Sequence, residues 1–155
     1  MQLRPLRTIA LVAIFLTCAC GSGYKEMTIA KGLVITPEWK EINPENALRI
    51  DREYQYIRIS VAESFDAFGG KGIKTPNGDV VNPEINLIGD GGDEVFPLEY
   101  VGSDRGPFGT FVNYGSAKQL PKNLEIRKVM IRSDITIQTD ELRWSVFDWR
   151  DVNTK

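Results

Sequence analysis

Apolar and polar residues alternate with a period of two along much of the chain. The clearest case is segment 53–64, EYQYIRISVAES, where Ile57, Ile59 and Val61 fall on one side of an extended backbone and polar or aromatic residues fall on the other. Such alternation is typical of a β-strand with one buried face. We therefore predict a strand here whose aliphatic face lies in the core.

Further segments have the composition of strands, because they are rich in aromatic and β-branched residues. These segments are 84–88, 94–101, 109–115 and 125–138. In the last segment the apolar residues change face between Ile126 and Val129. This change predicts a β-bulge near Arg127 and Lys128.

Segment 140–151 fits both a strand and a helix. As a strand it places Leu142, Trp144 and Val146 on one face, whereas helical spacing groups Leu142 and Val146 with Trp149. The helical grouping leaves Trp144 off the apolar face, so we predict a strand.

Turn-forming residues separate the predicted strands. Segment 75–80, TPNGDV, contains Asn-Gly, a strong β-hairpin signal because both residues tolerate positive φ. Segment 89–96, GDGGDEVF, lies between two predicted strands and has the same character. Segment 43–50, NPENALRI, suits one or two helical turns, with Asn43 as the cap and Pro44 at the first helical position.

The amino terminus, MQLRPLRTIALVAIFLTCACGSG, departs from the strand pattern. Arg4 and Arg7 precede an apolar run at 8–17, and small residues follow, which is the order of a secretory signal peptide. The apolar run is about half of the roughly 20 residues that a membrane-spanning helix needs. We therefore expect the chain to be exported.

The end of this leader, LTCAC, resembles the lipobox of bacterial lipoproteins, in which a small residue precedes the cysteine that becomes lipidated. Ala19 and Cys20 fit these two positions, while Thr17 stands where family members usually carry leucine. The resemblance implies cleavage before Cys20 and attachment of a diacylglycerol to its sulfur. Gly21 is not the aspartate that retains enteric lipoproteins at the inner membrane, which favours the outer membrane. The alternative is an ordinary cleaved signal peptide with two incidental cysteines.

These boundaries predict a signal peptide at 1–19, a lipidated N-terminus with a flexible tether at 20–31, and one domain at 32–155. Several short strands at intervals of about ten residues predict that this domain is all-β, an antiparallel β-sandwich. Its closing segment 129–148 resembles the last hairpin of immunoglobulin-like and fibronectin-like modules. The predicted architecture is therefore immunoglobulin-like.

The amino-acid composition excludes several kinds of binding and catalytic site. The chain has 19 Lys and Arg against 21 Asp and Glu, and loss of Arg4 and Arg7 with the leader leaves 17 against 21, a formal charge of −4. This charge gives no bulk attraction for nucleic acid. The chain has no histidine, which excludes a Ser-His-Asp triad and imidazole zinc sites. The only cysteines are Cys18 and Cys20, so the mature domain has no thiol for a disulfide or a thiolate metal site.

The acids of segment 89–96 are weak candidates for a metal site. Its GGDE resembles the start of the GGDEF signature of diguanylate cyclases, which bind GTP and magnesium, but Val95 replaces the phenylalanine and an exported domain meets no GTP. Asp90, Asp93 and Glu94 offer ligands of the type that calcium prefers, although the spacing of an EF-hand is absent. We predict a solvated turn here, with no metal and no other cofactor.

Two features suggest a contact surface. Tyr56 and Trp149 lie on faces opposite the aliphatic ones, so we predict that they are exposed, whereas the other large aromatic residues fill the core. The glycine-rich segment 64–79 is predicted to be a contact loop, because loops of this length are often functional.

These observations lead to one functional hypothesis and one alternative. The hypothesis is a non-catalytic cell-envelope lipoprotein, anchored to the membrane by lipid, whose domain binds an envelope protein or a glycan. The alternative is a secreted carbohydrate-binding or carboxylate-based hydrolytic domain. Catalytic carboxylates cannot be chosen among 21 acids, since their separation depends on the fold, and we therefore predict no catalytic residue.

Overall fold

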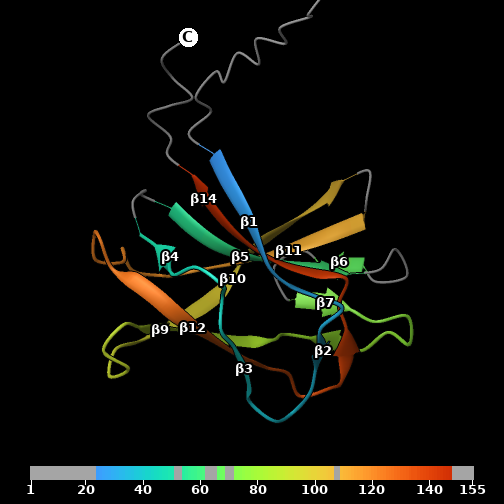
Figure 1. Cartoon of the computed structure of the whole chain (residues 1–155). Helices are drawn as coiled ribbons and strands as arrows, with labels where there is room; N and C mark the ends of the chain where they lie inside the picture. Colours follow the sequence, from blue (N-terminus) through green and yellow to red (C-terminus); the bar gives the residue numbers. More distant parts are fainter. Residues whose placement is uncertain (1–23, 51–53, 62–65, 69–71, 107–108, 148–155) are drawn as a thin grey trace, which may run out of the picture.

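The computed structural model describes residues 24–50, 54–61, 66–68, 72–106 and 109–147. These residues form β-strands, turns and irregular segments, and within them there is no helix long and apolar enough to cross a membrane. The main sheet has nine strands (Figure 1). In the order of pairing they are β1 (Tyr24–Lys31), β14 (Glu141–Phe147), β5 (Tyr54–Val61), β11 (Gly109–Gly115), β10 (Val95–Gly106), β9 (Glu84–Gly89), β12 (Glu125–Arg132) and β3 (Lys40–Ile42), with β4 (Leu48–Arg49) also pairing with β12.

Two small sheets complete the fold. One contains three short strands, β6 (Asp66–Phe68), β7 (Gly72–Lys74) and β8 (Val80–Val81). The other pairs β2 (Val34–Ile35) with β13 (Ile137–Gln138). All of these pairings, like those of the main sheet, are antiparallel, so the prediction of an all-β antiparallel fold is confirmed.

The long strand β10 makes the main sheet curve around one interior. Its first part pairs with β9 and its second part pairs with β11, with a register shift between Tyr100 and Gly102. Register shifts of this kind bend a strand and increase its twist. The strands therefore form one continuous, strongly curved sheet (Figure 1). An immunoglobulin-like arrangement of two separate sheets is not confirmed, because β10 belongs to both halves.

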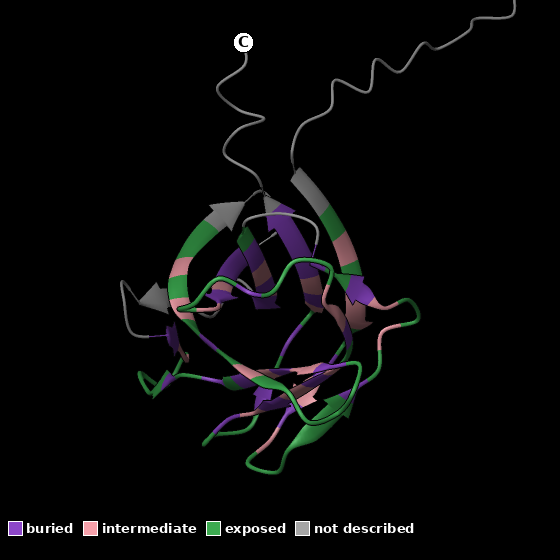
Figure 2. Ribbon diagram, turned by 90° about the vertical axis from the view of Figure 1, so that its left-hand side faces the viewer, coloured by how far each residue is buried: buried purple, intermediate pink, exposed green. Residues whose placement is uncertain are grey.

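The core follows the predicted alternation. Ile57, Ile59 and Val61 on β5 are each 0% exposed, which confirms the predicted buried face. Segment 141–147 is a strand rather than a helix, and Trp144 faces the core with 4% exposure. In Figure 2 the buried residues lie mainly along the strands, and most of the connecting loops are exposed.

The predicted turns and the predicted bulge are present. Residues 89–94 connect β9 to β10, where the Gly92 N–H donates to the Gly89 carbonyl at 3.0 Å. The Gly78 N–H donates to the Thr75 carbonyl at 2.9 Å in the hairpin between β7 and β8. The register of β12 shifts between Ile126 and Lys128, at the predicted position.

Residues 24–31 of the tether predicted at 20–31 instead form β1 at one edge of the main sheet. Met27 and Ile29 alternate along this strand and pack against the core, and this alternation is a strand signal that the prediction of a tether overlooked. Cys20 and the signal peptide predicted at 1–19 lie outside the described residues. The described domain begins at Tyr24 rather than at residue 32.

The helical turns predicted at 43–50 do not form. Leu48 instead pairs with Ile126 of β12 and is 1% exposed, so burial in the sheet outweighs the local preference. The Asn43 amide donates to the Glu41 carboxylate at 3.0 Å instead of capping a helix.

The contact loop predicted at 64–79 contains regular structure in its described residues, 66–68 and 72–79. These residues include β6, β7 and a turn, and Ile73 is 0% exposed. At Gly72, with φ of +115°, an added Cβ would lie 2.4 Å from the carbonyl oxygen of Val81. The glycine therefore allows β7 to pack against neighbouring backbone.

Candidate functional site

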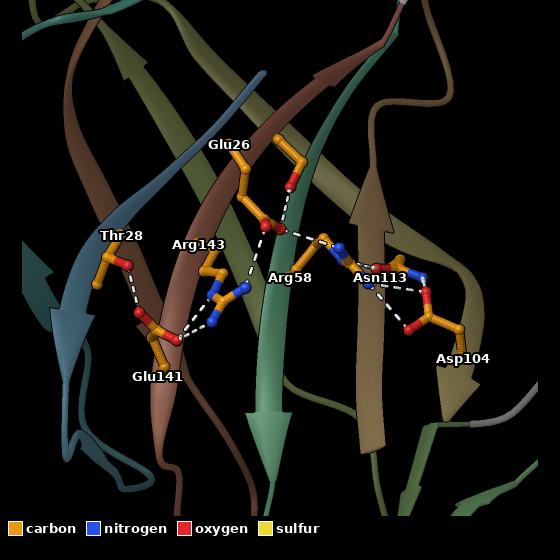
Figure 3. Close-up of polar contacts among 8 residues, drawn as sticks. Glu26, Thr28, Arg58, Asp104, Asn113, Glu141 and Arg143 are labelled. Atoms are coloured by element: carbon orange, nitrogen blue, oxygen red, sulfur yellow. Dashed lines mark hydrogen bonds and ion pairs between the residues drawn. The ribbon is translucent and has the colours of Figure 1, made fainter. Parts of the chain in front are cut away.

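The outward face of the main sheet carries a connected polar cluster, which we call the arginine network. It consists of Arg58 and Arg143 with their partners Glu26, Thr28, Asp104, Asn113, Glu141 and Ser145 (Figure 3). Arg58 and Arg143 lie directly opposite each other on β5 and β14. Like charges in such a position destabilise a strand pair, so nearby carboxylates must compensate them.

Glu26 on β1 supplies part of this compensation. Its carboxylate accepts hydrogen bonds from Nη1 of Arg58 at 2.9 Å and from Nη1 of Arg143 at 3.0 Å. The Ser145 hydroxyl donates to the same carboxylate at 2.9 Å. Only 22% of the Glu26 side chain is exposed, so solvent screens these ion pairs less than it screens surface pairs. One carboxylate from the edge strand thus bridges both arginines.

Arg58 also has partners on the strands to its other side. Its Nη2 atom lies 2.8 Å from the Asp104 carboxylate, and its Nε donates to the Asn113 side-chain oxygen at 3.0 Å. Asn113 is the direct neighbour of Arg58 across the β11–β5 pair. The network therefore links β1, β14, β5, β11 and β10.

Phe111 lies beneath the two guanidinium groups. The central carbon of the Arg58 guanidinium is 4.7 Å from the ring centroid, and that of Arg143 is 5.4 Å away. These distances permit cation–π attraction. Phe111 is 8% exposed, although it opposes Ser60 on the outward side of the sheet. The arginine side chains thus cover an aromatic ring that would otherwise face solvent.

Glu141 is held in its ionised form. Burial raises the pKa of its carboxyl, but hydrogen bonds from Thr28 and Arg143 outweigh burial, and the resulting pKa is below the ordinary value. The hydrogen bond that Arg143 donates to the Glu141 carboxylate likewise raises the pKa of Arg143. A glycosidase acid requires a carboxyl that stays protonated, with a raised pKa. The arginine network is therefore suited to joining strands and covering Phe111 rather than to proton transfer.

A cleft of about 350 Å³ lies next to this network on the sheet. We call it the tyrosine cleft; its lining includes Tyr54, Tyr56, Val101 and Gly115 together with residues 116–119. Tyr54 is 36% exposed and Val101 is 51% exposed. Apolar side chains with this exposure, gathered in one concave site, offer a surface to an apolar or amphipathic ligand.

Gly115 determines how Tyr56 lies in the tyrosine cleft. A Cβ added at Gly115 would be 3.0 Å from the Tyr56 ring and 3.3 Å from Val101, which is closer than ordinary contact. The glycine therefore leaves room for the ring to lie against the sheet. Burial, followed by the charge of Tyr54, raises the pKa of the Tyr56 phenol, so this hydroxyl is neutral at physiological pH.

The structure divides the residues that the sequence singled out. Tyr56 is partly exposed and lies in the tyrosine cleft, whereas its predicted companion Trp149 is outside the described residues. Of the weak metal candidates, Asp90 forms an ion pair with Arg127, and it does not join Asp93 and Glu94 in a group that could hold a metal. No group of three acids able to hold a metal occurs within the described ranges.

Sequence reasoning placed Tyr54 and Trp39 with the aromatic residues of the core, which is wrong because they are 36% and 39% exposed, and it missed Val101 and the whole arginine network. A signal was available for Tyr54, because it lies two residues before Tyr56 and therefore on the same face of β5. No local signal marked Val101, which reaches the tyrosine cleft only through the register of β10 and β11. Comparisons with family models, curated proteins and solved structures found no match. Function must therefore be argued from the geometry and from the leader.

Proposed function

We propose that this chain is a non-catalytic, lipid-anchored protein of the bacterial cell envelope. Cys20 is the lipidated residue, and the β domain binds an envelope component through its outward surface. The observation that carries the proposal is the lipobox-like LTCAC placed directly before a compact domain whose first strand begins at Tyr24. Only residues 21–23 separate the cysteine from that strand.

The chemistry of the anchor accounts for the arrangement. The Cys20 sulfur forms a thioether with a diacylglycerol, and the amino group freed by cleavage accepts a further acyl chain. Each buried methylene contributes about 0.8 kcal/mol, so several chains hold the protein at a membrane far better than one. No further anchor is then required. The domain is exported with the leader, and Gly21 favours the outer membrane.

Two properties of the domain support a binding role rather than catalysis. The arginine network uses its charged groups to pair with one another, and Glu141 is kept ionised. The tyrosine cleft offers exposed aromatic and aliphatic groups, with Lys118 as its one charged lining residue. Such a surface suits the burial of apolar area.

The proposal is tested by comparing Cys20→Ser with Cys18→Ser in a bacterial host that processes lipoproteins. Cys18 is the matched control, because it lies in the leader and is removed by the predicted cleavage. We expect wild type and Cys18→Ser to be found in membranes, with a mature amino terminus whose mass equals that of lipidated Cys20. We expect Cys20→Ser to retain its leader. Normal processing of Cys20→Ser, or a free Cys20 thiol in the wild type, contradicts lipid anchoring.

The tyrosine cleft also supports the alternative of a secreted carbohydrate-binding domain, since tyrosine faces stack on the flat apolar surfaces of sugars. A glycan array separates the two functions. A carbohydrate-binding domain binds defined glycans, and Tyr56→Ala abolishes that binding. A lipid-anchored protein whose cleft serves another ligand gives no Tyr56-dependent signal.

A further inference from the structure

We propose that the tyrosine cleft is a membrane-contact surface, and that its partner is the bilayer that holds the lipid on Cys20. This inference rests on the proposed lipidation and names the envelope component that the cleft meets. Three features support this contact: the short chain between Cys20 and Tyr24, which we call the leash, the position of the cleft in the sheet, and the chemistry of the residues that line it.

The leash is short. Four Cα–Cα steps connect Cys20 to Tyr24, so these two Cα atoms are at most about 14 Å apart, even if the chain between them is fully extended. A lipidated cysteine lies at the headgroup level, and the headgroup regions add only about 5–8 Å to each side of the hydrocarbon core. The end of the domain where β1 begins must therefore stay close to the bilayer surface.

The tyrosine cleft lies at that same end. Tyr24 pairs with Phe147, and Phe147 pairs with Tyr54, so the three residues form one row across β1, β14 and β5. Neighbouring strands are about 4.8 Å apart, which places the Tyr54 backbone about 10 Å from Tyr24. In Figure 1, β1 begins and β14 ends at the top of the molecule, while the loop between β2 and β3 is at the bottom. The cleft is thus near the leash and the β2–β3 loop is remote from it.

The lining of the cleft has the chemistry of a membrane interface. Tyrosine is enriched at the headgroup level, because its ring is apolar while its hydroxyl remains hydrated. The side chains of Tyr54 and Tyr56 line the cleft together with exposed Val101. Lys118 also lines the cleft, and its ammonium suits lipid phosphates, with about 1 kcal/mol expected where the lipids are anionic. These groups together match an interfacial contact.

The exposed aromatic residue described at the opposite end of the domain has a different setting. It is Trp39, 39% exposed, in the loop between β2 and β3, and the Arg132 guanidinium lies 4.6 Å from the Trp39 ring centroid. The guanidinium covers one face of that ring. Because the leash is attached at the other end of the domain, it holds the tyrosine cleft rather than Trp39 close to the bilayer.

The test places one probe at each end of the lipidated, full-length mature protein. Val101→Cys and Glu38→Cys are both at exposed positions, and each introduces the only free thiol, because Cys18 leaves with the leader and the Cys20 sulfur is blocked. Each variant is labelled with a fluorophore and reconstituted into vesicles of phosphatidylethanolamine and phosphatidylglycerol that carry a lipid-bound nitroxide quencher. We expect several-fold stronger quenching at position 101 than at position 38. Combining Tyr54→Ser and Tyr56→Ser with Val101→Cys should reduce that difference.

Failure of this inference is distinguishable from failure of the proposed function. Intact mass measured before reconstitution shows whether Cys20 carries lipid, and its absence overturns both proposals. If the protein is lipidated and vesicle-bound, but the two labels are quenched equally, the anchor stands and the membrane contact is wrong. Glycan binding that requires Tyr56, combined with an unquenched label at position 101, also overturns the membrane contact. Circular dichroism confirms that the variants keep their sheet.

Discussion

The two faces of strand β5 are stabilised by different interactions. On the inward face, Ile57, Ile59 and Val61 are completely buried among other apolar side chains. On the outward face, Arg58 keeps 17% of its side chain exposed and bonds to acids from β1 and β10. The stability of the inward face depends on the shape and buried area of each apolar side chain. The outward face depends on partners that other strands supply.

The two faces also differ in the way a substitution lowers stability. Removal of any inward residue leaves a cavity, and the cost depends on how far its surroundings collapse. Removal of an outward residue leaves a charge without its partner, and that cost depends on exposure to solvent. The strand that begins next to the proposed lipid anchor supplies Glu26, so the outward face is the one coupled to the attachment point.

The largest expected effect is on the inward face. Ile59→Ala removes a side chain that is 0% exposed and should lower the free energy of unfolding by about 3 kcal/mol. Ile135→Ala is the control, because Ile135 is 38% exposed and the change should cost less than about 0.5 kcal/mol. Urea unfolding followed by tryptophan fluorescence measures both. Equal losses for the two variants would mean that the inward face is not the main source of stability.

A smaller loss is expected on the outward face. Glu26→Gln leaves Arg58 and Arg143 opposite each other without the shared carboxylate, and should cost about 1–2 kcal/mol, since Glu26 is mostly shielded from solvent. The matched control is Glu84→Gln, because the Glu84 side chain is 59% exposed and pairs with Arg132 alone among the described ion pairs. Glu84→Gln should lower the free energy of unfolding by no more than about 0.5 kcal/mol.

The same urea unfolding measurement checks this pair of variants. Added salt should reduce the difference in free energy of unfolding between Glu26→Gln and wild type. This reduction should be smaller than for a fully exposed ion pair. A loss no greater for Glu26→Gln than for Glu84→Gln would show that the arginine network contributes nothing beyond an ordinary surface ion pair.

The smallest effect is expected in the acid dependence of stability. The folded-state pKa of Glu141 is lowered, because hydrogen bonds from Thr28 and Arg143 outweigh the effect of burial. A lowered folded pKa contributes stability above the unfolded pKa of about 4.3, and this stability is lost as the pH falls through the folded pKa. In the Glu141→Gln variant, the free energy of unfolding should therefore fall less steeply than in wild type as the pH drops below about 5.

Glu41→Gln is the comparison for that titration. Hydrogen bonds from Lys128 and Asn43 lower the pKa of Glu41 as well, but 44% of the Glu41 side chain is exposed, against 16% for Glu141. Solvent screening should make its effect on the acid limb smaller than that of Glu141. Urea midpoints measured across the acid range decide the order, and a larger effect for Glu41 would contradict the role given to the arginine network.

Sequence reasoning predicted the parts of the fold that depend on near neighbours. Alternation identified the buried faces of β5 and β14, and the change of face after Ile126 identified the bulge in β12. It failed where distant residues decide the outcome. Phe111 is on the outward face yet buried, because Arg58 and Arg143 cover it. Alternation alone predicts that this ring is exposed.

The candidate site was predicted only in part, for the same reason. Tyr56 was identified from its position opposite the aliphatic face of β5. The tyrosine cleft also requires Gly115 to lie beneath its ring and Val101 to lie beside it, and both positions result from the register of β10, β11 and β5. The register between strands that are far apart in the chain cannot be predicted from a local sequence pattern.

The sequence by itself determined most of the strands, their buried faces and the hairpin turns, because alternation and turn chemistry are properties of neighbouring residues. Only the tertiary structure decided that β14 lies between β1 and β5, and this order brings Glu26 within hydrogen-bond distance of Arg58 and Arg143. The physical reason is that these two hydrogen bonds join residues that are far apart in the chain, with separations of 32 and 117 positions. The same order places β1, and the short leash that precedes it, at the end of the sheet that carries the tyrosine cleft.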